Sequence, residues 1–236
     1  MVVLLISGWK RSGKDELAKI AESYSFQRFS FADDLKQKAS KEYGVPLEDF
    51  YSNEKKEAPI LTLPVYARDA FSDMINSFMF REFRTAAGIR PIGYAKRANG
   101  AFTDSQQGQQ LYHTPRSLAI LKGSVNRSVD PDFWAKQVSP LIQKLPHSGI
   151  VIPDWRYKNE KTTVEALARQ YGMKTITIRV NRFDTVESND PSERELDDAT
   201  FDITIQNRDT LQEFEAAVRS HLERIIGQMI TPAQWS

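Results

Sequence analysis

The chain has 236 residues, with 32 Lys and Arg against 31 Asp and Glu, so that its formal net charge is +1. This balance excludes an overall field that attracts nucleic acid or membranes, and any basic site must be local. The sequence contains no cysteine, which excludes disulfides, thiolate zinc sites and a cysteine nucleophile, and fits a reducing compartment. Because no apolar run reaches the roughly 18 to 20 residues of a membrane span, we expect a cytoplasmic protein without a membrane or nucleic-acid partner.

The N-terminal segment predicts a strand, a glycine-rich loop and a helix. Residues 2–6 are apolar in succession, as in a parallel strand that is covered on both faces. The stretch from Gly8 to Lys14 then has the spacing G-x-x-x-x-G-K, and apolar residues recur at helical spacing from Leu17 onward. Because this motif follows a strand and opens a helix, it predicts a phosphate-binding loop. The plain alternative is a surface loop that happens to hold two glycines and a lysine.

The next part of the chain predicts a helical insertion. Residues 26–33 alternate loosely and predict a second strand that ends at Ala32. Helical spacing begins at Leu35 and stops at Gly44, and a second helical pattern covers residues 71–79. Polar and glycine-rich residues that follow predict a loop or hairpin. We therefore expect a helical insertion over 35–110, between core segments 1–34 and 111–236.

The C-terminal half returns to alternating helices and strands. Thr114-Pro115 and Asp130-Pro131 each predict a helix start. Thr210 and Glu213 form the capping box of a C-terminal helix. The predicted strands lie at 149–154, 173–180 and 201–207, with a helix between the first two. Strands that alternate with helices predict a doubly wound α/β fold with a parallel sheet of about five strands.

Positive charge gathers at the glycine-rich loop, which carries Lys10, Arg11 and Lys14 in a nearly neutral chain. Backbone N–H groups and a helix start attract an anion there, and we expect Lys14 to reach the β- and γ-phosphates of a nucleotide. Asp15 stands where such loops supply Ser or Thr, and it either complements the helix dipole or holds Mg²⁺ directly or through water. Asp154, which follows a later strand, is the second candidate acid, with a helix cap or turn residue as the alternative.

A series of motifs resembles those of the bacteriophage-type deoxynucleoside monophosphate kinases, which belong to the phosphate-loop kinase superfamily. The motifs are KRSGKD, FADDLK, TPRSLAILKGS, DPDFW, IPDWRYKNE and DITIQN, and they extend in this order over nearly the whole chain. The resemblance implies transfer of the ATP γ-phosphoryl group to a dNMP, giving dNDP and ADP in the supply of dNTPs for DNA synthesis. It also implies Mg²⁺ as the cofactor and a cytoplasmic location, in the host if the chain is viral.

The resemblance, together with the loop motif, assigns roles to particular side chains. The residues expected to carry catalysis are Lys14, Asp15, Arg116, Asp154 and Arg156, with Mg²⁺ on Asp15 and Asp154. The residues expected at ATP are Gly8, Arg11, Ser12, Gly13, Lys14, Asp15, Glu16 and Arg182. The residues expected at the dNMP are Lys10, Leu35, Lys36, Arg116, Gly123, Ser124, Trp134, Asp154, Arg156 and Glu160. Arginines suit the acceptor phosphate because a guanidinium binds phosphate through two parallel hydrogen bonds.

Alternatives remain open at this point. The nearest is another small-molecule kinase with a GKD loop, such as an animal-type phosphomevalonate kinase, and another is a module that binds ATP without transferring phosphate. Arg182 and Arg194 flank a polar segment over 182–200, which is either a lid that closes over ATP or a solvated loop. Trp134 either packs in the core or contacts the substrate. The accepted base is open, and so is the choice between monomer and homodimer.

Overall fold

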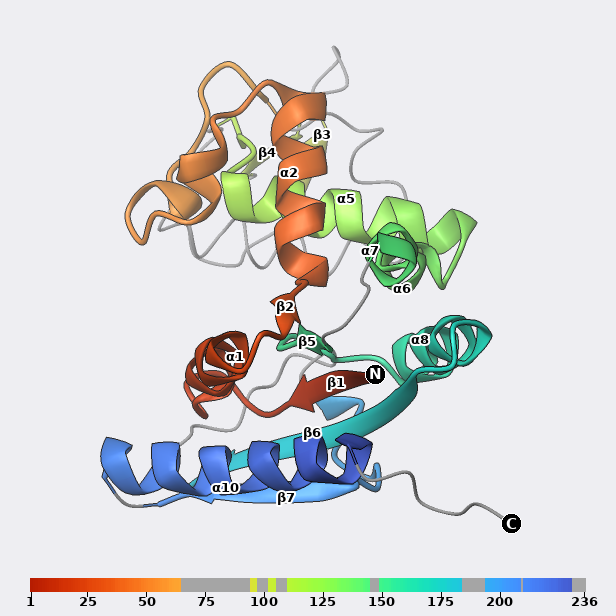
Figure 1. Ribbon diagram of the computed structural model, residues 1–236. Helices are drawn as coiled ribbons and strands as arrows, with labels where there is room; N and C mark the ends of the chain where they lie inside the picture. The colour runs from red at the N-terminus through yellow and green to blue at the C-terminus, as the bar shows by residue number, and fades with distance from the viewer. Residues whose placement is uncertain are drawn as a thin grey trace. The chain divides into compact units, whose positions relative to one another are not determined.

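The chain divides into two compact units in the computed structural model, which describes residues 1–64, 94–96, 102–104, 110–144, 149–183, 194–208 and 210–230. The core unit comprises Met1–Ala32 and Asp132–Ser236, and the helical unit comprises Asp33–Pro131 (Figure 1). The division differs from the expected boundary before residue 111, because the helix that follows Thr114 belongs to the helical unit. In the part of the chain that the structure describes, no helix is long and apolar enough to cross a membrane.

The core unit is built on a parallel sheet of five strands, which confirms the predicted α/β class. The strand order is β2 (Gln27–Arg28), β5 (Ile150–Ile152), β1 (Val2–Ser7), β6 (Lys174–Arg182) and β7 (Ile203–Asn207). Every neighbouring pair is parallel. The chain first fills the sheet on one side of β1 and then crosses to the other side. In open α/β sheets the crevice outside the carboxyl end of such a strand is where ligands bind.

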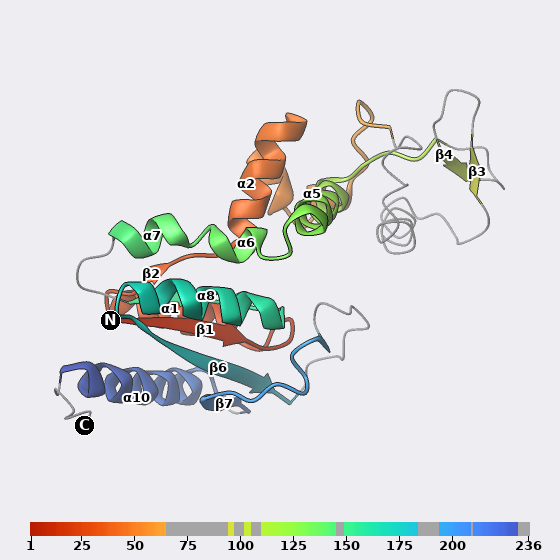
Figure 2. The ribbon, with the colours of Figure 1, turned by 90° about the vertical axis from the view of Figure 1, so that its right-hand side faces the viewer.

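Helices cover both faces of this sheet (Figure 2). Against one face pack α1 (Lys14–Ser23) and α10 (Leu211–Ile230), and α8 (Lys158–Gln170) lies on the other. Two shorter helices, α6 (Phe133–Lys136) and α7 (Ser139–Lys144), precede β5. The first face holds the main apolar cluster, whose buried members include Leu4, Ile6, Leu17, Ile20, Ile178, Val180, Phe214, Val218 and Leu222. This packing fixes the strand ends, and therefore the loops that follow them.

The helical unit contains most of α2 (Phe31–Tyr43), which begins in the core unit, and α5 (Pro115–Val129). Two short 3-10 helices follow α2, at Leu47–Phe50 and Lys55–Glu57. The helix start at Thr114 is confirmed, since its side chain accepts the Ser117 N–H in a capping box.

A short antiparallel pair lies where the sequence predicts a loop or hairpin. Its strands are β3 (Tyr94–Lys96) and β4 (Phe102–Asp104). The helical pattern predicted over residues 71–79 lies outside the described residues.

The segment after α1 differs from the strand predicted for residues 26–33. Pairing with β5 is limited to Gln27–Arg28, and α2 already begins at Phe31. The cause is a distant side chain, because the Asp154 carboxylate accepts the backbone N–H groups of Phe31 and Ala32. Satisfied donors in the first turn allow a helix to begin there.

Of two further helix starts predicted from the sequence, one is displaced and the other is confirmed. Asp130 is not an N-cap but closes α5, where its N–H donates to the Asn126 carbonyl. The next helix, α6, follows Asp132 instead. The capping box of α10 is confirmed, because Glu213 accepts from the Thr210 N–H and hydroxyl.

Candidate functional site

The loop between β1 and α1 depends on two glycines. A Cβ on Gly8, whose φ is +154°, would lie 2.4 Å from the Val180 carbonyl oxygen and 2.6 Å from Ser12 Oγ. Gly13 is the N-cap of α1 with φ +107°, and a Cβ there would lie 2.7 Å from Asn207 Nδ2. The first glycine of the G-x-x-x-x-G spacing is therefore needed because two backbone segments approach closely at Gly8. The second is needed because Gly13, the N-cap of α1, has a left-handed backbone conformation.

Lys14 turns back into this loop. Its Nζ donates hydrogen bonds to the carbonyl oxygens of Gly8, at 2.5 Å, and Trp9, at 2.7 Å. Lys10 and Arg11 are exposed on the same loop, and Arg11 has the positive φ of +67°. The ammonium group thus lies over the loop, where an anion would meet it together with backbone N–H groups.

Ser12 adds a polar atom that the loop itself does not satisfy. The residue is 1% exposed, and its Oγ has no hydrogen-bond partner among the described residues. A buried hydroxyl without a partner costs free energy, and a phosphate oxygen at the loop would supply an acceptor for it. Ser12 therefore fits the role predicted for it at the phosphates.

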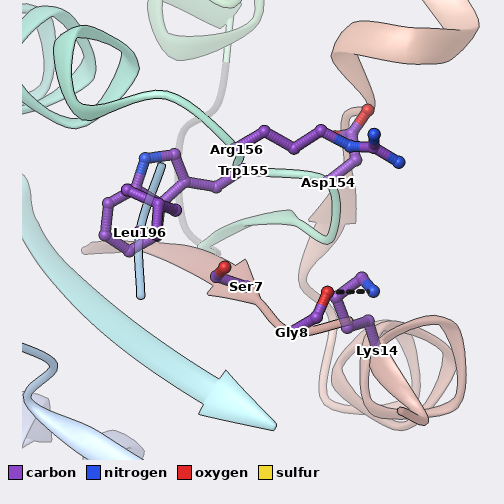
Figure 3. A pocket seen from close by; sticks show the side chains of 7 residues that line it. All are labelled: Ser7, Gly8, Lys14, Asp154, Trp155, Arg156 and Leu196. Atoms are coloured by element: carbon purple, nitrogen blue, oxygen red, sulfur yellow. Dashed lines mark hydrogen bonds between the residues drawn. The ribbon is translucent and has the colours of Figure 1, made fainter. Parts of the chain in front are cut away.

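A pocket lies at the carboxyl end of β1 and β5 in the core unit (Figure 3). Figure 3 shows the Lys14 side chain folded against Gly8 and the Arg156 side chain extended from the segment after β5. The residues that line the pocket are Ser7, Gly8, Lys14, Asp154, Trp155, Arg156 and Leu196. The structure therefore brings together the loop, its lysine and two of the charged residues expected from the IPDWRYKNE motif.

The two acids of that motif hold the starts of helices. Asp154 accepts from the Ser30 hydroxyl at 3.0 Å and from the Phe31 and Ala32 N–H groups at 3.2 and 2.7 Å. Glu160 is buried, and its carboxylate accepts the backbone N–H groups of Arg156 and Tyr157 at the start of α8. The helix-cap interpretation of Asp154 is thus observed, and Glu160 has a similar structural contact.

The acids next to Lys14 form ion pairs. Asp15 Oδ1 lies 2.6 Å from Nη2 of Arg28 on β2, and Glu16 pairs with Lys19 one turn later in α1. Among the residues that the structure describes, no group of three or more His, Asp and Glu side chains is arranged to hold a metal ion. A Mg²⁺ ion on Asp15 or Asp154 would compete with these contacts for the carboxylate oxygens.

Trp134 and the arginines of the predicted lid lie elsewhere in the core unit. Trp134 is 1% exposed and packs edge to face on Phe133, as the core interpretation predicts. Arg182 is the exposed last residue of β6. Arg194 Nε lies 3.4 Å from the Asp197 carboxylate. Residues 184–193 of the predicted lid lie outside the described part of the chain.

The remaining predicted residues belong to the helical unit. Leu35 on α2 packs against α5 at Gly123, where an added Cβ would lie 3.0 Å from Leu35 Cδ1. Ser124, the next residue, is half-buried. The glycine therefore serves the contact between the two helices.

The predicted phosphate-binding cations of the helical unit have acidic or aromatic neighbours. Arg116 Nε donates to the Glu57 carboxylate. Lys36 Nζ lies 3.9 Å from Asp33 Oδ1 and 4.0 Å from the centre of the Tyr51 ring. These contacts hold both cations in place, and an acceptor phosphate would have to compete with the carboxylates for them.

Sequence reasoning missed a polar cluster on β6. Arg179 is buried, donates to Ser7 Oγ at 3.0 Å and lies 3.3 Å from Asp197 Oδ1, which also accepts from the Trp9 indole N–H. The signal was the alternation of polar residues in an otherwise apolar strand. Asn207, at the end of β7, was also missed as a loop contact, and its side-chain amide donates to the Ser12 carbonyl at 2.8 Å.

Comparison with known proteins adds little to this picture. No protein-family model matches the chain, and no curated protein sequence is similar to it. Among solved structures, the crystal structure of TT1252 from Thermus thermophilus is similar to 94% of this chain and 97% of that one. The sequence identity is 13% and the TM-score 0.44, so this likeness carries no argument about function. The fold class rests on the parallel sheet itself.

Proposed function

We propose that the protein is a deoxynucleoside monophosphate kinase, which transfers the γ-phosphoryl group of ATP, supplied with Mg²⁺, to a dNMP. The observation that carries the proposal is the loop between β1 and α1. Lys14 lies over a backbone turn that only glycine permits at Gly8, and the loop precedes a helix at the carboxyl edge of a parallel sheet. This arrangement binds a polyphosphate through backbone N–H groups and one ammonium.

The chemistry asks for alignment and charge neutralisation more than for covalent participation. When phosphates bind, Lys14 exchanges the carbonyl oxygens of Gly8 and Trp9 for phosphate oxygens, which are stronger acceptors because they are charged. Arg156, in the same pocket, neutralises charge on the phosphoryl group. In the helical unit, Arg116 and Lys36 bind the acceptor phosphate. We place the reaction in the cytoplasm, with small-molecule substrates only.

The test is an acceptor panel with ATP and Mg²⁺, in which ADP release is measured for each dNMP and for phosphomevalonate. We expect turnover with at least one dNMP and none with phosphomevalonate. Lys14→Ala should lower kcat/KM by at least about 100-fold, as loss of one charged group at a transferring phosphoryl does. Lys174→Ala, at the opposite end of β6, is the matched control and should leave turnover unchanged. No turnover with any dNMP would refute the proposal.

A further inference from the structure

Arg28 is a charged residue beside the phosphate loop that the predicted roles leave out. It lies on β2, where it is in register with Val151 of β5, and its guanidinium reaches across to Asp15 in the first turn of α1. Two residues later, Ser30 contacts Asp154, which lines the pocket that also contains Lys14. Arg28 therefore lies between the start of α1 and the loop that leads to α2.

The two side chains of the Arg28–Asp15 ion pair differ in their exposure to solvent. The Arg28 side chain is 28% exposed, whereas that of Asp15 is 76% exposed. The single contact uses Nη2 of Arg28, so Nε and Nη1 have no hydrogen bond to any residue that the structure describes. A guanidinium carries five N–H donors in a planar fork, and such a fork matches two phosphate oxygens at once. The carboxylate thus holds the arginine while leaving donors for an anion.

We propose that Arg28 is an additional phosphate-binding side chain of the nucleotide site, and that Asp15 positions Arg28 instead of ligating Mg²⁺. The inference rests on the proposed function, since it assigns a further residue to the same site. It also explains how a loop that begins a helix with two acids, Asp15 and Glu16, can receive a polyphosphate. Each acid is neutralised by its own cation, Arg28 or Lys19.

Mg²⁺ enters this account through the contacts that the carboxylates of Asp15 and Asp154 already make. Mg²⁺ prefers six oxygen ligands in near-octahedral geometry and commonly keeps several waters and substrate phosphates among them. Asp15 and Asp154 direct their oxygens at a guanidinium and at backbone N–H groups. We therefore assign neither carboxylate to the inner coordination shell of the metal.

The test measures binding of AMPPNP, a non-hydrolysable ATP analogue, by isothermal titration calorimetry with Mg²⁺ and again with EDTA. Arg28→Gln should weaken binding by about 10-fold or more under both conditions, as loss of a charged hydrogen bond does. Arg28→Lys should restore part of the affinity, because it keeps the charge without the fork. Arg169→Gln, an exposed arginine on α8, is the matched control and should bind as the wild type does.

Asp15→Asn separates positioning from metal ligation. It should weaken binding by no more than about 5-fold, the scale of an exposed ion pair, and equally with Mg²⁺ and with EDTA. In the Arg28→Gln background it should cause no further weakening, because Asp15 acts through Arg28. Wild-type affinity in Arg28→Gln, or loss of the Mg²⁺ dependence in Asp15→Asn, would overturn the inference alone. Absence of binding by the wild-type protein would overturn the proposed function as well.

Discussion

The two units satisfy their charged side chains in different ways. In the core unit, three charged groups near the phosphate loop contact backbone, whereas Asp15 and Glu16 form ion pairs with Arg28 and Lys19. Lys14 donates to carbonyl oxygens of the loop, and Asp154 and Glu160 accept N–H groups at the starts of helices. In the helical unit, the charged groups contact one another, as Arg116 does with Glu57 and Lys122 with Glu42.

This difference predicts how each unit responds to substitution. A side chain that satisfies buried backbone groups leaves orphaned donors or acceptors when it is removed, and the folded state is destabilised. A half-exposed ion pair contributes little to folding, because solvent screens it and both side chains lose freedom. We therefore expect substitution of the acids that accept backbone N–H groups in the core unit to change stability. Substitution of the ion pairs in the helical unit should change mainly ligand affinity.

The largest effect is expected for Gly8→Ala. Its Cβ would lie 2.4 Å from the Val180 carbonyl oxygen, which is backbone and cannot rotate away. The loop must shift, so the free energy of unfolding should fall by about 2–3 kcal/mol and AMPPNP binding should weaken by at least about 100-fold. Gly227→Ala is the matched control, because nothing lies within 4 Å of its added Cβ in α10. It should be neutral or stabilise by up to about 1 kcal/mol.

A smaller loss is expected for Asp154→Ala, measured by urea denaturation without nucleotide or metal. The substitution leaves the N–H groups of Phe31 and Ala32 without their acceptor, and a lost helix cap costs about 1–2 kcal/mol. Asp154→Asn keeps one carbonyl oxygen and should cost less. The control is Asp198→Ala, an exposed partner of Lys158, which should change stability by less than about 0.5 kcal/mol. Equal stability of Asp154→Ala and wild type would contradict the capping role.

Whether the sequence predicts a feature depends on how far apart in the chain the contacting residues are. The apolar run of β1, the glycine spacing, the helix start at Thr114 and the capping box at Thr210 depend on neighbours in sequence, and the structure confirms them. The end of β2 was predicted wrongly because it depends on Asp154, which is 123 residues from Phe31. No local pattern encodes such a contact.

The ion-pair partners of charged residues could not be predicted from the sequence either. The loop motif identifies Asp15 as a candidate site residue. Its contact with Arg28, however, joins two separate elements, α1 and β2. Arg116 and Glu57 are 59 residues apart. Periodicity reports which face of an element is buried, and it does not report which opposite charge comes to lie beside a given cation.

In the helical unit, Glu57→Gln should leave stability within about 0.5 kcal/mol of wild type and change binding instead. It releases Arg116 from its carboxylate partner, so the affinity for the accepted dNMP should rise by about 2- to 5-fold, whereas Arg116→Ala should lower it by at least about 10-fold. Calorimetric titration with the dNMP gives both values. Glu48→Gln, an exposed acid of the same unit, should bind as wild type does. If Glu57→Gln lost as much stability as Asp154→Ala does, the expected difference in stability effects between the two units would be refuted.

The smallest effect concerns Asp202, a core-unit carboxylate that also accepts a backbone N–H. Burial works to raise the pKa of Asp202, but hydrogen bonds from the Thr177 N–H and hydroxyl outweigh it and lower the pKa below its ordinary value. A carboxyl with a lowered folded-state pKa stabilises the protein above its unfolded pKa of about 3.9, and this stabilisation is lost as pH falls through the lower folded value.

Asp202→Asn should therefore lower the free energy of unfolding by only about 0.5 kcal/mol at neutral pH, because solvent screens the partly exposed carboxylate. The difference from wild type should vanish in acid below the folded-state pKa, where the wild-type carboxyl is also uncharged. Urea denaturation of both proteins across this pH range measures it. A difference that grew as pH fell would mean that the carboxylate destabilises the fold, and would contradict a stabilising role for its contact with the Thr177 backbone.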